Sequence, residues 1–282
     1  MSWRESISRS NMVLTTARRN ASIGVLSSAT AAASAGAITI LPYAGMAAAH
    51  ASNTFSTDAG DITVHPVSHA SFVMETPAGV LYVDTVGEAS QYEGMPDPDL
   101  ILITHRHGDH YNADLLATLP EAPILTNADV KGMMPEGLQA RTDVIAPGEG
   151  TEMMGLGIEA IPSYNITEGR TDFHPKDRGD LGFVLTIDGT RVYVSGDTEA
   201  TPEMRALEDI DLAFVCMNLP FTMTAEQAAE GVAEFAPAMV MPYHYRGRDG
   251  GTQDPQKFAR LLEDAGASTE VWFHDWYNGA LG

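Results

Sequence analysis

The chain has 282 residues, of which 44% are hydrophobic, and its 16 lysines and arginines stand against 38 aspartates and glutamates. This length is sufficient for one large domain with a substantial core. The net charge of −22 argues against nucleic acid or an anionic membrane surface as the main partner, because both would be repelled. The single cysteine, Cys216, excludes an intramolecular disulfide and any multi-cysteine metal cluster.

The first part of the chain differs in composition from the rest. Arg18-Arg19 precedes a long uncharged run, rich in alanine and serine, that ends in the small-residue sequence Ala49-His50-Ala51. This order predicts a twin-arginine-like export signal over 1–51, removed when the protein reaches the periplasm, and then a linker over 52–60. An uncleaved membrane anchor and a disordered tail are the alternatives. Glycine and proline within the run weaken the membrane-spanning version, so no integral membrane domain is expected.

The main domain is predicted over 61–282, in which strands and helices alternate. Period-two patterns and turn residues predict strands at 62–64, 71–75, 80–84, 100–103, 124–126, 153–161, 181–185, 191–194, 210–217, 238–241 and 269–273. Capping residues and helical spacing predict helices at 113–119, 129–134, 202–208, 225–235 and 255–264. This alternation indicates the α/β (α+β) class.

The richest cluster of chemical groups follows the buried strand at 100–103. His105, His107, Asp109 and His110 lie within six positions of one another. Residues two apart on extended chain point the same way, whereas a turn at Gly108 redirects the two that follow. One segment can therefore serve two adjacent metal positions, and its imidazoles and carboxylate suit zinc, with manganese or iron also possible. The alternative is a solvated histidine-rich loop, or caps on a following helix.

The order His-x-His-x-Asp-His after a strand resembles the signature of the metallo-β-lactamase superfamily, and the resemblance extends over most of the chain from about Asp61. It implies a four-layer αββα sandwich with metal ligands at strand ends on one edge. Asp197, in Ser-Gly-Asp-Thr, corresponds to the carboxylate that bridges two metals, and His244 corresponds to the last histidine ligand. The implied ligand set is His105, His107, Asp109, His110, Asp197 and His244.

The chain departs from the superfamily pattern where many relatives carry a fifth histidine at a strand end. It has Ser-Tyr-Asn there, ending in Tyr164 and Asn165, followed by Phe-His-Pro-Lys with His174. This order resembles a branch of ascorbate-phosphate-lactonase-like hydrolases. Either Asn165 or His174 completes the first metal position, or the site holds one metal tightly and the other loosely. Two further interpretations remain open, in which Tyr164 and Asn165 donate hydrogen bonds to substrate and His174 belongs to a mobile lid over 169–179.

The same branch has a segment similar to the Val-x-His-Ala-Ser-Phe sequence around His69, so we expect His69 and Asp84 beside the site. For His69, a role behind the ligands and a role as a satisfied core histidine are both open. Arg246 is a candidate contact for an anionic small-molecule substrate, with a solvated loop charge as the alternative. Cys216 is interpreted as a buried core residue rather than a metal ligand. The β-lactamases of this superfamily use a cysteine as a metal ligand, so the resemblance does not favour antibiotic hydrolysis.

Together these features predict an exported metal-dependent hydrolase with one or two zinc ions that acts on an ester-like bond, a lactone or a phosphodiester. The metal activates water and polarises the substrate oxygen. Asp109 and His244 are the expected catalytic residues, with Asp109 orienting the nucleophile or accepting its proton. The alternative is an exported, non-catalytic metal- or ligand-binding protein on the same scaffold. The sequence does not indicate an oligomeric state.

Overall fold

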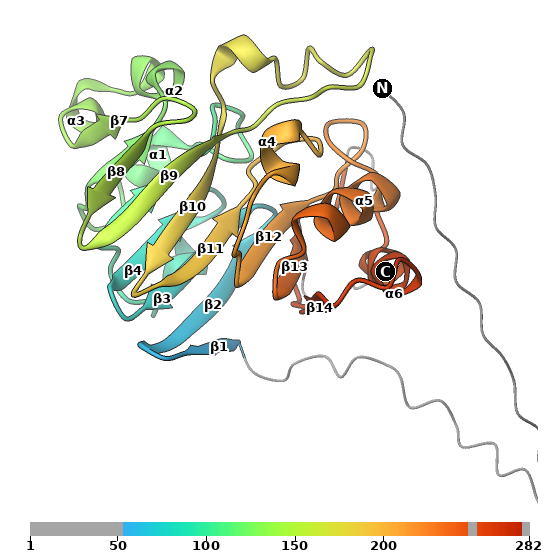
Figure 1. The fold of residues 1–282 in the computed structure, drawn as a ribbon. Coiled ribbons are helices and arrows are strands. Elements are labelled where there is room, and N and C mark those ends of the chain that lie inside the picture. The colour runs from blue at the N-terminus through green and yellow to red at the C-terminus, as the bar shows by residue number, and fades with distance from the viewer. Residues whose placement is uncertain (1–52, 248–252, 278–282) are drawn as a thin grey trace, which may run out of the picture. The chain divides into compact units, whose positions relative to one another are not determined.

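The computed structural model describes residues 53–247 and 253–277 (Figure 1). The predicted export signal lies outside these residues. All of the described residues belong to the compact unit Met46–Gly282. Within the described ranges, no helix has the length and apolar character needed to cross a bilayer.

The described strands form two sheets of seven strands each, and the two sheets have the same arrangement of strands. The first sheet contains β1 (Thr54–Thr57), β2 (Gly60–Ser68), β3 (Ser71–Thr76), β4 (Gly79–Val83), β5 (Leu100–Leu102), β6 (Ile124–Thr126) and β7 (Thr142–Val144). The second sheet contains β8 (Gly150–Met153), β9 (Leu156–Pro162), β10 (Leu181–Ile187), β11 (Thr190–Val194), β12 (Leu212–Cys216), β13 (Met239–Tyr243) and β14 (Glu270–Val271). In both sheets the first four strands are antiparallel and the later ones parallel.

Helices cover the outer faces of the sheets. They are α1 (Ala113–Leu116), α2 (Ala128–Met133), α3 (Glu136–Gln139), α4 (Pro202–Arg205), α5 (Ala225–Phe235) and α6 (Pro255–Asp264), with 3-10 turns at Ala89–Tyr92 and Lys176–Arg178. In Figure 1, α1 to α3 (green) lie apart from α4 to α6 (orange to red). The first three pack on the first sheet and the others on the second. The predicted four-layer αββα sandwich is confirmed.

Alternating side chains of β5 show how one strand serves two layers. Leu100 and Leu102 belong to the large core that includes the second sheet, whereas Ile101 and Ile103 pack with the residues of α1, α2 and α3. Successive side chains on a strand point to opposite faces, so an apolar run without polar alternation is required when both faces are covered. Packing on both faces therefore holds in place the strand from which the histidine motif begins.

Two predictions, one of a linker and one of a strand, are corrected by the structure. The sheet begins at Thr54, inside the stretch 52–60 that was expected to be a linker, because β1 pairs with β2 through a tight turn. The expected strand at 153–161 is instead a hairpin in which Met153 and Leu156 pair, with Gly155 in left-handed backbone between them. Glycine adopts that conformation at little cost, which allows the reversal.

Parallel strands of both sheets end at the same edge of the sandwich. Asp84 follows β4 and the histidine motif follows β5, while Asp197 and His244 follow β11 and β13. The two sheets are joined there by a backbone hydrogen bond from Leu181 to the carbonyl of Thr104, 3.0 Å long. Predicted ligands that lie far apart in sequence are therefore brought close together at this edge.

Candidate metal centre

Three histidines form the first half of a cluster at this edge. Nε2 of His105 lies 3.1 Å from Nδ1 of His107, and the ring of His174 lies 5.1 and 4.9 Å from their rings. One ligand nitrogen from each of the three falls within 4.8 Å of the others. The structure thus groups His174 with the two motif histidines that were predicted for the first metal position.

The second half contains the remaining predicted ligands. Nε2 of His244 lies 3.2 Å from Nε2 of His110 and 3.6 Å from Oδ2 of Asp109. Asp197 adds Oδ1 at 3.3 Å from His244 and 3.5 Å from His110. His110 and His244 are fully buried, whereas Asp109 is 41% exposed at its side chain. Asp109 is therefore the most accessible ligand candidate of this half.

Asp197 lies between the two halves. Its Oδ1 faces His110 and His244, and its Oδ2 lies 3.4 Å from Nε2 of His174. Among the described residues, Oδ1 of Asp197 and Nε2 of His174 have no hydrogen-bond partner although both are buried. A buried polar atom without a partner is costly, and imidazole and carboxylate lone pairs that converge in this way fit a divalent cation on each side of Asp197.

The charges within the cluster are strongly coupled. Burial alone would raise the pKa of Asp197, but His244 and His110 outweigh it and hold that pKa well below its ordinary value. Burial alone would lower the pKa of His110, but Asp197 and Asp84 raise it well above the ordinary value. Burial lowers the pKa of His174 to about 4. Without metal, a proton on His110 thus partly compensates the buried carboxylates.

Asp84 holds His110 from behind, as predicted for a residue beside the site. Oδ2 of Asp84 lies 2.7 Å from Nδ1 of His110, and the same carboxylate accepts hydrogen bonds from the backbone nitrogen and hydroxyl of Thr104 at 2.7 and 2.8 Å. With Nδ1 engaged, Nε2 of His110 is directed into the cluster.

Asp84, His69 and His244 all have left-handed φ angles of +46°, +57° and +46°. Such backbone is costly outside glycine and is concentrated at functional sites.

The loop between β9 and β10 fixes His174. The backbone nitrogen of Asn165 donates to the carbonyl of His174 at 2.9 Å, and its side-chain amide donates to the carbonyls of Arg170 and Phe221. Buried Glu199 accepts hydrogen bonds from two further loop nitrogens at 2.8 and 2.6 Å. Asn165 therefore positions the loop that carries His174, and His174, at 1% exposure, is not part of an open lid.

The other two substrate candidates lie at the margins of the site. The hydroxyl of Tyr164 donates to Glu203 at 2.8 Å and accepts from Lys176 at 3.0 Å, so it is engaged with side chains near the surface. The guanidinium of Arg246 lies 4.0 Å from the centre of the Tyr277 ring. Arg246, two positions after His244 in the sequence, therefore packs against an aromatic side chain at the rim of the cluster.

Three residues around the cluster were missed in the sequence. Nη1 of Arg178 lies 3.1 Å from Nε2 of His107, and Nδ2 of Asn218 lies 2.9 Å from Nε2 of His244. The hydroxyl of Tyr277 lies 3.0 Å from Nδ1 of His69. Asn218 could have been found, since it follows a predicted strand at the same edge. Arg178 lies in a 3-10 turn and Tyr277 follows the last strand, and local sequence patterns do not indicate the path of either segment.

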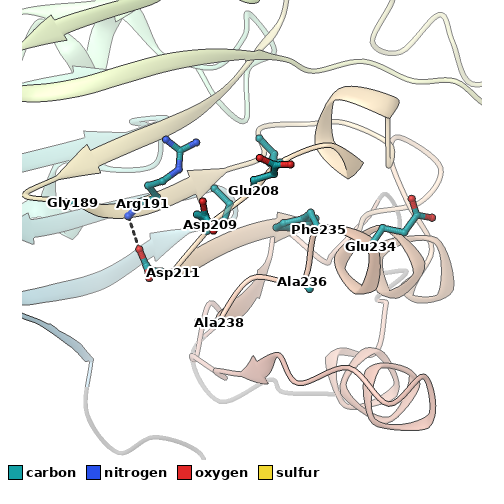
Figure 2. Close-up of a pocket in the computed structure, with 11 residues that line it drawn as sticks. Gly189, Arg191, Glu208, Asp209, Asp211, Glu234, Phe235, Ala236 and Ala238 are labelled. Atoms are coloured by element: carbon teal, nitrogen blue, oxygen red, sulfur yellow. Dashed lines mark hydrogen bonds between the residues drawn. The ribbon is translucent and has the colours of Figure 1, made fainter.

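A hollow of about 710 Å³ lies at the opposite end of the second sheet (Figure 2). It is lined by residues near the amino ends of β11, β12 and β13, among them Asp211 and Ala238. Figure 2 shows the hydrogen bond from the backbone of Arg191 to Asp211, 2.8 Å long. Asp197 and His244 follow the carboxyl ends of these strands, so the hollow is separate from the metal cluster.

Comparison with known proteins agrees with this geometry. The model of a family described as the β-lactamase superfamily domain matches residues 63–244, and the chain belongs to the metallo-β-lactamase superfamily. A UPF0173 metal-dependent hydrolase of Pyrococcus abyssi is 28% identical over 212 residues, which cover 72% of this chain and 93% of the relative. A second one, of Thermococcus onnurineus, is 31% identical over 173 residues, covering 60% of this chain and 76% of the relative.

A solved structure from Parabacteroides distasonis, described among the metal-dependent hydrolases, shares 34% identity and superposes with a TM-score of 0.68. The match covers 78% of this chain and 96% of that one. None of these three descriptions names a substrate. The narrower resemblance to ascorbate-phosphate lactonases therefore stays a prediction.

Proposed function

We propose that the chain is a metal-dependent hydrolase that holds two divalent cations and cleaves an ester-like bond, a lactone or a phosphodiester, in a small anionic substrate. The observation that carries the proposal is the placement of buried Asp197 between two sets of ligands. His105, His107 and His174 lie on one side of it. The other side is occupied by Asp109, His110 and His244.

The donor set suits zinc, and manganese or iron would also accept it. When bound, such cations lower the pKa of a water molecule and polarise a substrate oxygen. The chain's own contribution is to fix the ligands through Asp84, Asn218 and the loop around Asn165, and to place an acid–base group. Burial alone would raise the pKa of Asp109, but His110, His244 and a backbone hydrogen bond together outweigh it and keep that pKa below its ordinary value. Asp109 is then ionised at neutral pH and can orient water or accept its proton.

An anionic substrate is supported by the cationic side chains at this edge. Arg178 lies against His107 and is paired with Asp180, while Arg246 lies at the rim beside Tyr277. In a chain with 16 basic and 38 acidic residues, two arginines near one cluster favour a substrate of negative charge. The resemblance to lactonase-like relatives supports the ester-like bond.

Hydrolysis of chromogenic lactones, carboxylic esters and bis(p-nitrophenyl) phosphate by the full-length protein tests the proposal. Activity should require metal and disappear on chelation. The variants His107→Ala and Asp197→Ala should lose at least 1000-fold in turnover, since each removes a ligand that the chemistry needs. Full activity in both variants would reject the mechanism. Metal binding without hydrolysis of any substrate class would support the non-catalytic alternative.

We also propose that residues 1–51 direct export to the periplasm. The support is the paired arginines followed by an uncharged, small-residue run. Cell fractionation tests the proposal. A shortened protein in the periplasmic fraction, dependent on Arg18 and Arg19, is the expected result, and full-length protein confined to the cytosol would contradict it.

A further inference from the structure

His69 lies beside the second half of the cluster without belonging to the predicted ligand set. It occupies the turn between β2 and β3, and its ring meets the ring of His244 edge to face at 4.6 Å. One of its ring nitrogens falls within 4.8 Å of ligand atoms of Asp109 and His244. His110 and His244 are fully buried, whereas His69 is only partly buried. The side chain thus stands between the cluster and solvent.

Tyr277 contacts Nδ1 of His69 and therefore bears on which ring nitrogen carries the hydrogen. The hydroxyl of Tyr277 lies 3.0 Å from Nδ1 of His69 and accepts a hydrogen bond from the backbone nitrogen of Arg246 at 3.3 Å. The phenolic oxygen accepts there, and its one hydrogen is available for donation to Nδ1 of His69. A neutral imidazole that accepts at Nδ1 has its own hydrogen on Nε2. No hydrogen-bond partner of that Nε2 is found among the described residues.

A role of His69 as a metal ligand is disfavoured by the set already present. Asp109, His110, Asp197 and His244 supply four ligands to the second position, which is the number that zinc takes in most sites. Nδ1 of His69 is engaged with Tyr277. When Nδ1 accepts from Tyr277, what remains on His69 is an N–H donor beside Asp109, whose side chain is 41% exposed.

We propose that His69 is a further catalytic residue: its Nε2–H donates a hydrogen bond to an oxygen of the substrate that gains negative charge during hydrolysis. Tyr277 is its positioning residue. The inference rests on the proposed function and adds a substrate contact that is independent of the metal ligands. A fixed donor aimed at developing charge contributes more in the transition state than in the bound substrate.

The test uses full-length protein with His69→Ala and Tyr277→Phe, and His65→Ala as the matched control. His65 lies on β2, before the same turn, and pairs with Glu75 away from the cluster. We expect His69→Ala to keep its metal content and thermal midpoint near those of the wild type and to lose about 100-fold in kcat, with a smaller change in KM. Tyr277→Phe should lose about tenfold in kcat, because the hydrogen on Nε2 is no longer fixed. His65→Ala should match the wild type.

Two results would overturn the inference: unchanged kcat in His69→Ala, or the loss of a metal equivalent, which would make His69 a ligand. If the wild type hydrolyses none of the substrates, the proposed function fails, and calorimetric binding of inorganic phosphate to the metal-loaded protein tests His69 alone. Phosphate affinity weakened at least tenfold in His69→Ala supports the contact. Equal affinity in both proteins, or no phosphate binding by the wild type, rejects it.

Discussion

Hydrogen bonds from residues behind the predicted ligands fix the orientation of the ligand side chains. Asp84 engages Nδ1 of His110 at 2.7 Å and also accepts from Thr104, whose hydroxyl lies 3.0 Å from Nδ1 of His105. One buried carboxylate thereby influences a histidine of each half. Carboxylates in this position fix the tautomer of a metal-binding imidazole and increase its basicity.

Asp84→Asn should weaken metal binding about 10- to 100-fold without removing any ligand. The amide that replaces the carboxylate carries no negative charge, and only one of its two polar atoms can accept a hydrogen bond. Competition with a chromogenic chelator measures the affinity. Asp99→Asn is the control, because Asp99 also caps a backbone nitrogen, that of Val80, but at an exposed position. Equal affinities in the two variants would show that Asp84 does not support the site.

Metal binding should release a proton. Asp197 and Asp84 outweigh burial and raise the pKa of His110 well above its ordinary value, so the metal-free protein holds a proton there at neutral pH. A cation must displace that proton, and affinity should therefore rise with pH until the raised pKa is passed. Calorimetry in two buffers of different ionisation enthalpy measures the release. A zinc titration at pH 7 with no net proton release would contradict this assignment.

At the scale of elements, the best-predicted parts are those with strong local signals. α5 and α6 begin and end at the predicted residues, each with a capping side chain, Thr224 and Asp254, before it. β1 and the hairpin of β8 and β9 were missed, since short strands depend on their pairing partners more than on their own residues. The site shows the same division. The motif at 105–110 was visible locally, whereas the approach of His174 depends on a long loop.

The loop that carries His174 is contacted by a buried glutamate, Glu199, and by a more exposed one, Glu203, and the two should differ in their effect on metal binding and stability. Glu199 is buried, accepts from the backbone nitrogens of Ile166 and Thr167, and lies 2.8 Å from Nη2 of Arg170. Glu199→Ala should release the segment that carries His174 and lower the free energy of unfolding by about 2 kcal/mol or more. Bound metal should fall toward one equivalent. Denaturant unfolding and elemental analysis measure the two effects.

Glu203→Ala is the matched comparison, because Glu203 holds the same loop through Lys176 at a more exposed position. An exposed ion pair contributes about 0–1 kcal/mol, so this variant should keep both metals and nearly all of its stability. If Glu203→Ala lost metal and Glu199→Ala did not, the loop would be held from its surface rather than from its buried side.

At the scale of the whole molecule, the described domain consists of two sheets of the same design facing each other. Each runs from antiparallel to parallel strands, and the parallel strands of both end at the metal cluster. Neither sheet alone supplies the site, since the motif at 105–110 comes from the first sheet and Asp197 and His244 from the second. Metal binding should therefore join the two sheets and stabilise the folded domain.

The charge of −22 gives a further prediction at this scale. Self-repulsion destabilises a compact acidic protein, and salt screens it as the Debye length falls from about 10 Å at 0.1 M to about 3 Å at 1 M. The thermal midpoint should rise by several degrees between 0.1 and 1 M sodium chloride. Choosing chloride limits the general stabilisation that sulfate would add. A midpoint that falls with salt would show that attractive ion pairs outweigh the repulsion.

The central claim is that Asp197 joins two metal positions, and metal content per chain tests it most directly. Elemental analysis of full-length protein purified without chelators should find about two equivalents. His174→Ala should lose the metal of the first position, and Asp197→Ala should lose both. About one equivalent in the wild type, unchanged by His174→Ala, would contradict the account and leave a single metal held by Asp109, His110, Asp197 and His244.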